Sequence, residues 1–376
     1  MRYKLSDICF YAKGKVDVSG LTDADYISTE NMMPNKGGVT IASSLPSTAQ
    51  TQAYRKDDVL VSNIRPYFKK IWFANCNGGC SNDVLVFRAK EDTDARFLYY
   101  VLADDAFFDY STATSKGTKM PRGDKTAIMQ YEVPHFDLPI QKKIAGILAD
   151  IDNKISLNNN INNNLEQQAK ALYKNWFFDF STFSSDGNLP DGWRLGTVGD
   201  IIQLHDSKRV PLSGAERNKM AKVYPYYGAA SRMDYVDSYL FDGIYLLLGE
   251  DGTVVDSLGF PILQYVYGQF WVNNHAHIIT GKEGFSVEEL YLLFSLTNIK
   301  SIVTGAVQQK VSQQNLKKVP AIIPGKEALD AFDEIIQPVF TQIRNLRDEN
   351  ANLAVLRDTL LPKLMSGELD VSDVDL

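Results

Sequence analysis

The sequence predicts a mixed α/β (α+β) protein with two related globular domains, each followed by one long helix. The first observation is the length of 376 residues, which exceeds the size at which a single hydrophobic core usually stops growing. The second is a set of motifs that recurs in the same order in both halves of the chain. The third is a heptad pattern in two segments, which predicts that the two long helices pair as an antiparallel coiled coil.

These patterns divide the chain into six parts. The first domain covers residues 1–138, the first long helix residues 139–180, and a linker containing Ser and Gly residues 181–191. The second domain covers residues 192–320, the second long helix residues 321–367, and an acidic tail residues 368–376.

The internal repeat consists of five pairs of motifs at low sequence identity. They are an aromatic and basic opening before a helix-like start, a strand led by Asp, a strand that follows Asn, an aromatic helix and a basic loop led by Gly. In the same order, the pairs are Tyr3-Lys4-Leu5 and Trp193-Arg194-Leu195, Asp58–Val61 and Asp242–Leu246, Asn82–Val86 and Asn274–Ile279, Phe97–Leu102 and Leu290–Phe294, and Gly117–Arg122 and Gly305–Lys310. Short β-rich runs mixed with helices and turns favour an α+β or mixed α/β domain.

The two helical segments carry apolar residues at steps of three and four, interrupted by polar residues. The first seam is Ile144, Leu148, Ile151, Ile155, Asn158, Asn162, Leu165, Ala169, Leu172 and Trp176. The second is Ile336, Val339, Ile343, Leu346, Asn350, Leu353, Leu360 and Leu364, with Arg357 as an interruption. Asn in a seam often sets register or the choice of partner. The alternative is that each helix packs only on its own domain.

Proline and glycine mark the expected ends of these helices. Pro139 and Pro324 lie near the two starts, where proline is tolerated. Pro338 is an alternative start for the second helix, and Gly367 is a candidate C-terminal cap.

The charge distribution excludes a strong, non-specific polyanion binder. The net charge is −7, but residues 321–376 hold 5 Lys+Arg against 11 Asp+Glu, which leaves the rest of the chain close to neutral. A local basic face therefore remains open. The start of the chain has no signal-peptide core, and three cysteines fit a reducing compartment, so we expect a cytoplasmic protein.

Motifs of several enzyme classes are absent from the sequence. It contains no amino-methyltransferase motif of the Asn/Asp-Pro-Pro-aromatic type, no Walker loop, no His-Glu-x-x-His and no Glu-x-Lys. Cys76 and Cys80 lack further metal ligands nearby and are expected to be free thiols on a turn. His275 and His277 would face one side of a strand, but no third ligand lies near them in sequence. No metal is therefore expected.

Three clusters carry side chains suited to reading DNA. Arg and Asn can make bidentate contacts to guanine and adenine, whereas Lys favours phosphate. The alternative for each cluster is a solvated loop. The first cluster is Ser62, Asn63, Arg65, Tyr67, Lys69 and Lys70; the second is Lys116, Lys119, Arg122 and Lys125, with Gln308, Gln309 and Lys310 as its counterpart; the third is Tyr226, Asn273, Asn274, His275 and His277.

The chain resembles the specificity subunits of type I restriction-modification systems over nearly its whole length. The helical runs Pro139–Asp152 and Leu361–Leu369 look like the signatures of that family, and Asp58–Tyr67 and Asn273–His277 resemble its target recognition domains. The resemblance implies that each domain reads one half of a split site on double-stranded DNA and that the coiled coil sets the spacing.

The resemblance also implies partners. Two methyltransferase subunits would dock on the helices and carry S-adenosylmethionine, and a motor-nuclease subunit would join them for restriction. This chain would have no catalysis and no cofactor of its own. The candidate docking residues are Ile144, Ile151, Asn158, Leu165, Ile343, Asn350 and Leu353.

Two other functions remain open at this point. A scaffold would bind the partners but show equal affinity for all duplexes. An enzyme of an unrecognised class would methylate or cleave DNA without partners. Because the domains are nearly neutral, we expect the chain alone to bind DNA weakly and in a salt-dependent manner.

Overall fold

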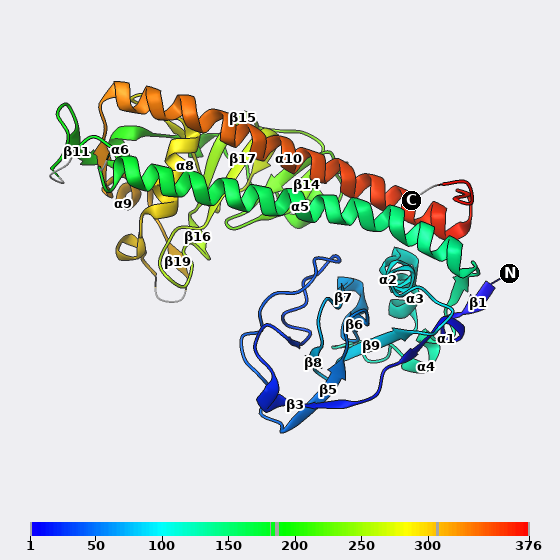
Figure 1. The fold of residues 1–376 in the computed structure, drawn as a ribbon. Helices are drawn as coiled ribbons and strands as arrows, with labels where there is room; N and C mark the ends of the chain where they lie inside the picture. The colour runs from blue at the N-terminus through cyan, green and yellow to red at the C-terminus, as the bar shows by residue number, and fades with distance from the viewer. Residues whose placement is uncertain (1, 181, 185–187, 306–307, 375–376) are drawn as a thin grey trace. The chain divides into compact units, whose positions relative to one another are not determined.

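The computed structural model describes residues 2–180, 182–184, 188–305 and 308–374. Of the predicted linker 181–191, Ser181 and residues 185–187 lie outside the described residues, as do the last two residues of the predicted tail. The chain divides into two units: unit 1 is Met1–Asn158 with Asp348–Leu376, and unit 2 is Asn159–Arg347. Each unit thus contains one predicted domain and a stretch of each long helix (Figure 1).

Unit 1 builds its domain around two four-stranded sheets, with strand orders β2-β9-β6-β7 and β3-β5-β8-β4, and a small pair β1-β10. Its elements are β1 (Arg2–Lys4), α1 (Leu5–Ile8), β2 (Cys9–Tyr11), β3 (Lys15–Asp17), η1 (Val18–Gly20), β4 (Tyr26–Ile27), β5 (Gln50–Tyr54), β6 (Val59–Ser62), η2 (Pro66–Phe68), β7 (Ile71–Phe73), β8 (Gly78–Cys80), β9 (Val84–Ala89), α2 (Ala95–Ala103), α3 (Asp105–Ala113), α4 (Lys125–Ile128) and β10 (Glu132–Pro134).

Unit 2 has one six-stranded sheet, β12-β18-β15-β17-β13-β14, and the small pairs β11-β20 and β16-β19. Its elements are β11 (Arg194–Thr197), α6 (Val198–Ile201), β12 (Ile202–Leu204), η3 (Asp206–Lys208), α7 (Gly214–Arg217), β13 (Tyr224–Tyr227), β14 (Arg232–Val236), β15 (Phe241–Gly249), β16 (Asp251–Gly252), β17 (Leu263–Val272), β18 (Ala276–Gly281), α8 (Val287–Leu296), η4 (Lys300–Ile302), β19 (Gln309–Lys310), α9 (Gln313–Lys317) and β20 (Pro320–Ile323).

The two domains share one topology, which confirms the predicted duplication. The order β2-β9-β6-β7 matches β12-β18-β15-β17, and all of these pairs are antiparallel. The parallel pair β4-β8 in unit 1 corresponds to β13-β17 in unit 2. β17 is long enough to cover the positions of both β7 and β8, so the strands that form two sheets in unit 1 form one in unit 2.

The predicted alignment of the repeat is correct in some motifs and shifted in others. Asp83 and His275 both lie one residue before the equivalent strands β9 and β18, as predicted. At the opening, Leu5 begins α1, but Leu195 lies in β11, is 77% exposed, and the equivalent helix begins at Val198. The predicted register was therefore wrong by three residues, because the matched aromatic-basic pairs do not occupy equivalent positions.

The predicted register of the Asp-led strands was also wrong. Leu60 pairs with Val86, and Leu247 pairs with Ile278 in the equivalent strands, which aligns Asp58 with Tyr245. Asp242 lies three residues earlier in β15.

The long helices are α5 (Leu138–Phe177) and α10 (Lys326–Ser366). In each unit, a stretch of α5 lies antiparallel to a stretch of α10 (Figure 1). In unit 1, Asp152 accepts from Arg357 at 2.8 Å, while Asn158 lies further along α5 and donates to Glu349, earlier in α10, at 2.7 Å. Arg357 therefore interrupts the apolar seam but pairs across it.

Each helix also contributes to the core of its unit. In unit 1, Ile144 and Leu148 of α5 and Leu364 of α10 belong to the core that includes α2 and α3. In unit 2, α5 contributes Ala169, Tyr173 and Phe177, and α10 contributes Phe332, Ile336 and Phe340. Each long helix therefore packs in the cores of both units, so the alternative that each helix packs only on its own domain is wrong.

The ends of the helices follow local chemistry. Pro139 lies in the first turn of α5, and Asp137 Oδ1 accepts from Ile140 N at 3.1 Å. Gly367 has φ +75° and ends α10, as predicted. Pro338 does not start the second helix, because α10 begins at Lys326 and continues through it. Pro338 is exposed, so water can reach the carbonyl that lacks its usual donor.

Candidate nucleic-acid interface

In unit 1, backbone hydrogen bonds bring the first and second predicted clusters together. Asn63 N donates to Asp83 O at 2.8 Å, and Asn63 O accepts from Gly123 N at 3.1 Å. These bonds join the end of β6, the residue before β9 and the end of the hairpin 116–122. We call this set of contacts the loop junction of unit 1.

Unit 2 has the same loop junction. The residue after β15 is Glu250, whose N donates to His275 O at 2.8 Å and whose O accepts from Val311 N at 2.8 Å. The segments joined are the end of β15, the residue before β18 and the end of the hairpin 304–310. The counterpart cluster Gln308–Lys310 therefore lies beside part of the third cluster.

The two hairpins are built alike. Lys116 pairs with Arg122, and Thr304 pairs with Lys310, each as an antiparallel bridge. Gly117 has φ +96° and Gly305 has φ +87°, a backbone conformation that favours glycine. Of the second hairpin, Ala306 and Val307 lie outside the described residues.

Most of the candidate cations of unit 1 already have partners. Lys69 pairs with Asp105, Arg122 with Asp83, and Lys116 with Asp124, and Lys70 Nζ donates to Thr29 O. Burial lowers the pKa of Lys70. Burial opposes the charge of Asp105, but its contacts with Lys36 and Lys69 outweigh this and lower its pKa.

Four other candidate side chains of unit 1 remain available for DNA. Lys119 and Lys125 are exposed and have no ion-pair partner among the residues that the structure describes. Tyr67 is 48% exposed. Arg65 has φ +50°, and its Nε is buried without a hydrogen-bond partner among the described residues. A strained arginine with an unused donor is typical of a functional loop.

The structure corrects several predicted contact residues by placing their side chains inside the protein. In unit 1, Ser62 is 4% and Asn63 7% exposed. In unit 2, Tyr226 is 1% exposed and its hydroxyl bonds to Leu212 N at 3.1 Å. Asn273 is also buried, and its Oδ1 accepts from His275 N at 2.8 Å. These buried side chains are not exposed to a ligand at the protein surface.

The two histidines predicted to share one face differ in environment. His275 lies before β18, its side chain is 44% exposed, and Nδ1 contacts Asp251. His277 lies within β18 and is fully buried. The exposed candidates of unit 2 are Asn274, Gln308, Gln309 and Lys310. His275 is half-buried, and its side chain is 44% exposed.

Sequence reasoning missed the groups that surround His277. Asp206, Glu250 and His277 bring possible metal-ligand atoms within 4.8 Å of one another, so the third group that was lacking locally comes from distant segments. A cation already lies among them, because Arg209 Nη1 is 2.6 Å from Glu250 Oε2 and its Nη2 is 3.6 Å from Asp206 Oδ2. The cluster is therefore an ion-pair network.

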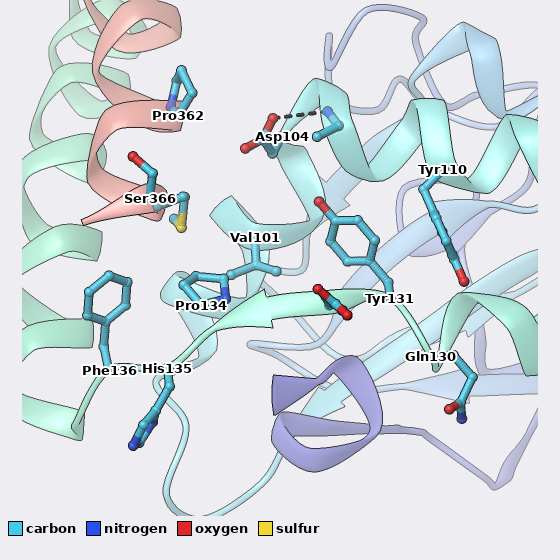
Figure 2. A pocket seen from close by; sticks show the side chains of 13 residues that line it. Val101, Asp104, Tyr110, Gln130, Tyr131, Pro134, His135, Phe136, Pro362 and Ser366 are labelled. Atoms are coloured by element: carbon cyan, nitrogen blue, oxygen red, sulfur yellow. Dashed lines mark hydrogen bonds between the residues drawn. The ribbon is translucent and has the colours of Figure 1, made fainter. Parts of the chain in front are cut away.

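An open groove of about 890 Å³ in unit 1 contains none of the predicted contact residues. Figure 2 shows Asp104 at the start of α3, Tyr131 and Pro134 near β10, and Pro362 and Ser366 on α10 around it. The topologically equivalent place in unit 2 is an apolar groove of about 480 Å³ that includes Tyr173, Leu293 and Ala321. Polar and apolar residues both line the groove of unit 1, whereas the groove of unit 2 is mainly apolar.

The predicted docking residues on the helices mostly face inward. Ile144, Asn158 and Ile343 are buried, and Ile151, Leu165, Asn350 and Leu353 are half-buried. They hold the helices together and to the domain cores. The exposed apolar residues of the two helices include Leu157, Val355 and Leu356 in unit 1 and Ile161 and Ile335 in unit 2.

The cysteines are free thiols, but the expected turn is only partly correct. Cys76 lies in a loop, whereas Cys80 is buried in β8. Burial raises the pKa of Cys9 and of Cys80 to about 12, so neither is suited to act as a nucleophile. Among the described residues, no helix is long and apolar enough to cross a lipid bilayer.

Comparison with known proteins agrees with this architecture. The family model of the type I restriction modification DNA specificity domain matches residues 1–167 and 190–353. The MjaIX specificity subunit of Methanocaldococcus jannaschii is 23% identical over 95% of this chain and 88% of its own length. The HindI specificity subunit of Haemophilus influenzae is 23% identical over 98% of this chain and 99% of its own.

A solved structure supports the fold. The S subunit of the type I restriction-modification system from M. genitalium aligns with a TM-score of 0.57 at 17% identity, over 99% of this chain and 96% of that one. With two matches to the family model that span most of its length, the chain belongs to the DNA specificity subunits of type I restriction-modification systems.

Proposed function

We propose that unit 1 and unit 2 each read one half of a split site on double-stranded DNA. The observation that carries this proposal is the loop junction, which has the same backbone bonds in both units but different side chains. The exposed side chains around it include Tyr67 and Lys119 in unit 1 but Asn274 and Gln309 in unit 2. Equal geometry with unequal chemistry suits two readers of different half-sites.

The contacts would differ between the halves. In unit 1, Arg65 and Tyr67 would approach base edges, and Lys119 and Lys125 would contact phosphate. In unit 2, Asn274, Gln308 and Gln309 offer amides suited to adenine, and Lys310 offers a cation. Near-neutral domains predict weak, salt-dependent binding by the chain alone, so the partners would add cationic surface.

We further propose that two methyltransferase subunits dock on the helices and methylate adenine in each half-site. Support comes from the duplicated topology, because two similar units can seat two identical partners. Exposed apolar residues such as Leu157 and Val355 on the helices offer contact area. S-adenosylmethionine would bind to those subunits, a motor-nuclease subunit would join for restriction, and this chain would perform no chemistry in the cytoplasm.

Co-expression with a candidate methyltransferase subunit, followed by mapping of methyladenine in host DNA, tests this function. We expect co-purification and one split motif with a methylated adenine on each strand. Co-purification without new methylation, together with equal affinity for all duplexes, would favour a scaffold. Methylation or cleavage by the purified chain alone would contradict a purely recognising role.

A further inference from the structure

His277 bridges two segments of the loop junction of unit 2. Its side chain is fully buried in β18. Nδ1 lies 2.6 Å from Asp206 Oδ2, and Nε2 lies 2.8 Å from Val311 O. Asp206 belongs to η3, and Val311 directly follows β19 of the hairpin 304–310. The ring therefore links η3 to the base of that hairpin.

Both ring nitrogens of His277 face acceptors. A carbonyl such as Val311 O can only accept, and Asp206 also receives hydrogen bonds from Gln313 Nε2 at 2.5 Å and Ile278 N at 2.9 Å. A neutral imidazole has one N–H and one lone pair, so one of its two contacts would be repulsive. N–H groups on both nitrogens satisfy both contacts, which makes the ring an imidazolium.

The carboxylate partner is suited to hold this cation. Burial raises the pKa of Asp206, but the hydrogen bond and charge of His277, the bond from Ile278 N and the charge of Arg209 outweigh it, so the pKa lies below its ordinary value. Glu250 is the second carboxylate facing the ring, at 3.7 Å from Nδ1.

Two further cations share these carboxylates. Arg209 Nη1 is 2.6 Å from Glu250 Oε2, and Lys310 Nζ is 3.6 Å from Glu250 Oε1. Arg209 Nη1 also donates to Ala276 O at 2.7 Å. The network thereby touches the end of β15, the start of β18 and β19, which are the three segments of the loop junction. The partly buried pair of His275 and Asp251 lies beside it.

Unit 1 has different side chains at these positions. Val61 pairs with Leu85 as Leu248 pairs with His277, so Leu85 is the equivalent of the histidine. Ala12 N donates to Val86 O as His205 N donates to Ile278 O, which aligns Lys13 with Asp206. The hairpin of unit 1 is instead fixed by surface pairs of Arg122 with Asp83 and Lys116 with Asp124.

We propose that His277, protonated on both ring nitrogens, is a positioning residue that holds Val311 and the adjoining strand Gln309–Lys310 in place to read the half-site of unit 2. It does not touch DNA. This inference rests on the proposed division of the site between the units. It implies that loss of the ring relaxes recognition in one half of the motif only, because the loop junction of unit 1 does not use it.

The test uses the full chain in complex with its methyltransferase subunit. His277→Leu, which introduces the apolar residue type of unit 1, is compared with His135→Leu, a histidine on an exposed part of unit 1. Methylation is measured on duplexes with one base changed in either half. For His277→Leu we expect discrimination to fall about 10-fold in one half, which is within the range that one mismatched base pair causes, and to stay unchanged in the other.

A second, milder variant keeps the proposal testable if His277→Leu does not fold. Gln313→Ala removes the donor 2.5 Å from Asp206 on an exposed residue, and a smaller loss in the same half is expected. Discrimination unchanged in both variants, or reduced equally in both halves while the complex stays intact, would overturn the proposal.

A spectroscopic measurement does not depend on the proposed function. In the ¹⁵N NMR spectrum of histidine-labelled chain, the signal lost in His277→Leu should come from a ring with both nitrogens protonated. A neutral tautomer would overturn the positioning argument even if the split motif is found. If the ring is doubly protonated but no split motif is found, the division of the site between the units is refuted. The network around His277 would then have a structural role only.

Discussion

Glu289 is a buried carboxyl in unit 2 that should make the stability of this unit fall as pH rises. It lies in the first turn of α8, fully buried, and Oε2 accepts from Ser286 N at 2.8 Å. Oε1 has no partner among the described residues. Burial raises the pKa of Glu289 to about 8; the bonds from Ser286 oppose this rise, and the charge of Asp333 adds to it.

The expected magnitude follows from this pKa. In the unfolded chain the carboxyl ionises near its ordinary pKa of 4.5, whereas the folded unit keeps its proton until about pH 8. Between these values the folded state binds more protons, so stability decreases with pH and the loss is complete above pH 8. A shift of this size corresponds to about 5 kcal/mol.

Glu289→Gln removes the titration and keeps an acceptor for Ser286. The amide leaves a buried donor that costs roughly 1–3 kcal/mol. We therefore expect the variant to be less stable than the parent at pH 5 and more stable at pH 9, by about 2–4 kcal/mol.

Guanidinium unfolding followed by tryptophan fluorescence measures this effect in the correct unit. Trp72 is in unit 1, while Trp176, Trp193 and Trp271 are in unit 2. A Trp72→Phe background in both proteins restricts the signal to unit 2. If the difference in unfolding free energy between the two proteins stays constant from pH 5 to pH 9, the reasoning about Glu289 is wrong.

Three further predictions concern unit 1. Arg357→Leu removes the charged donor to Asp152 Oδ1 at 2.8 Å and leaves this carboxylate with the hydroxyl of Tyr100, which should lower the unfolding free energy by roughly 1–3 kcal/mol; an unchanged thermal midpoint would contradict this. Lys119→Ala should reduce the slope of log affinity against log salt by about 1 in the complex if this lysine contacts a phosphate, and an unaltered slope would exclude that contact. Gly117→Ala strains a backbone at φ +96° and should cost about 1 kcal/mol, whereas Gly20→Ala, with open space around it, serves as the control.

The repeat and the helical seams could be predicted because they depend on patterns that survive divergence. The glycine that begins each hairpin and the Asn before each central strand were aligned correctly, since both sit at turns with strict backbone needs. The opening motif was misaligned because Trp193 and Arg194 resemble Tyr3 and Lys4 in type but occupy other positions relative to the first helix. The residue type alone does not determine which positions of the two repeats are equivalent.

The interior of the candidate site was beyond sequence reasoning. His277 was grouped with His275 by alternation, but its environment is set by Asp206, 71 residues away, and by Val311, 34 residues away. Tyr226 looked like a surface aromatic because nothing local showed that its hydroxyl bonds to Leu212. A turn-rich segment such as Asn273–His275 does not reveal which of its polar groups bond back to the backbone.

The central claim is that each unit reads its own half of the DNA site. The most direct test compares Arg65→Ala in unit 1 with Gln309→Ala in unit 2, each co-expressed with the methyltransferase subunit, by mapping methyladenine across host DNA. Each variant should relax bases in one half of the split motif, and the two variants should affect opposite halves. Relaxation of the same half by both, or of both halves by either, would contradict this claim.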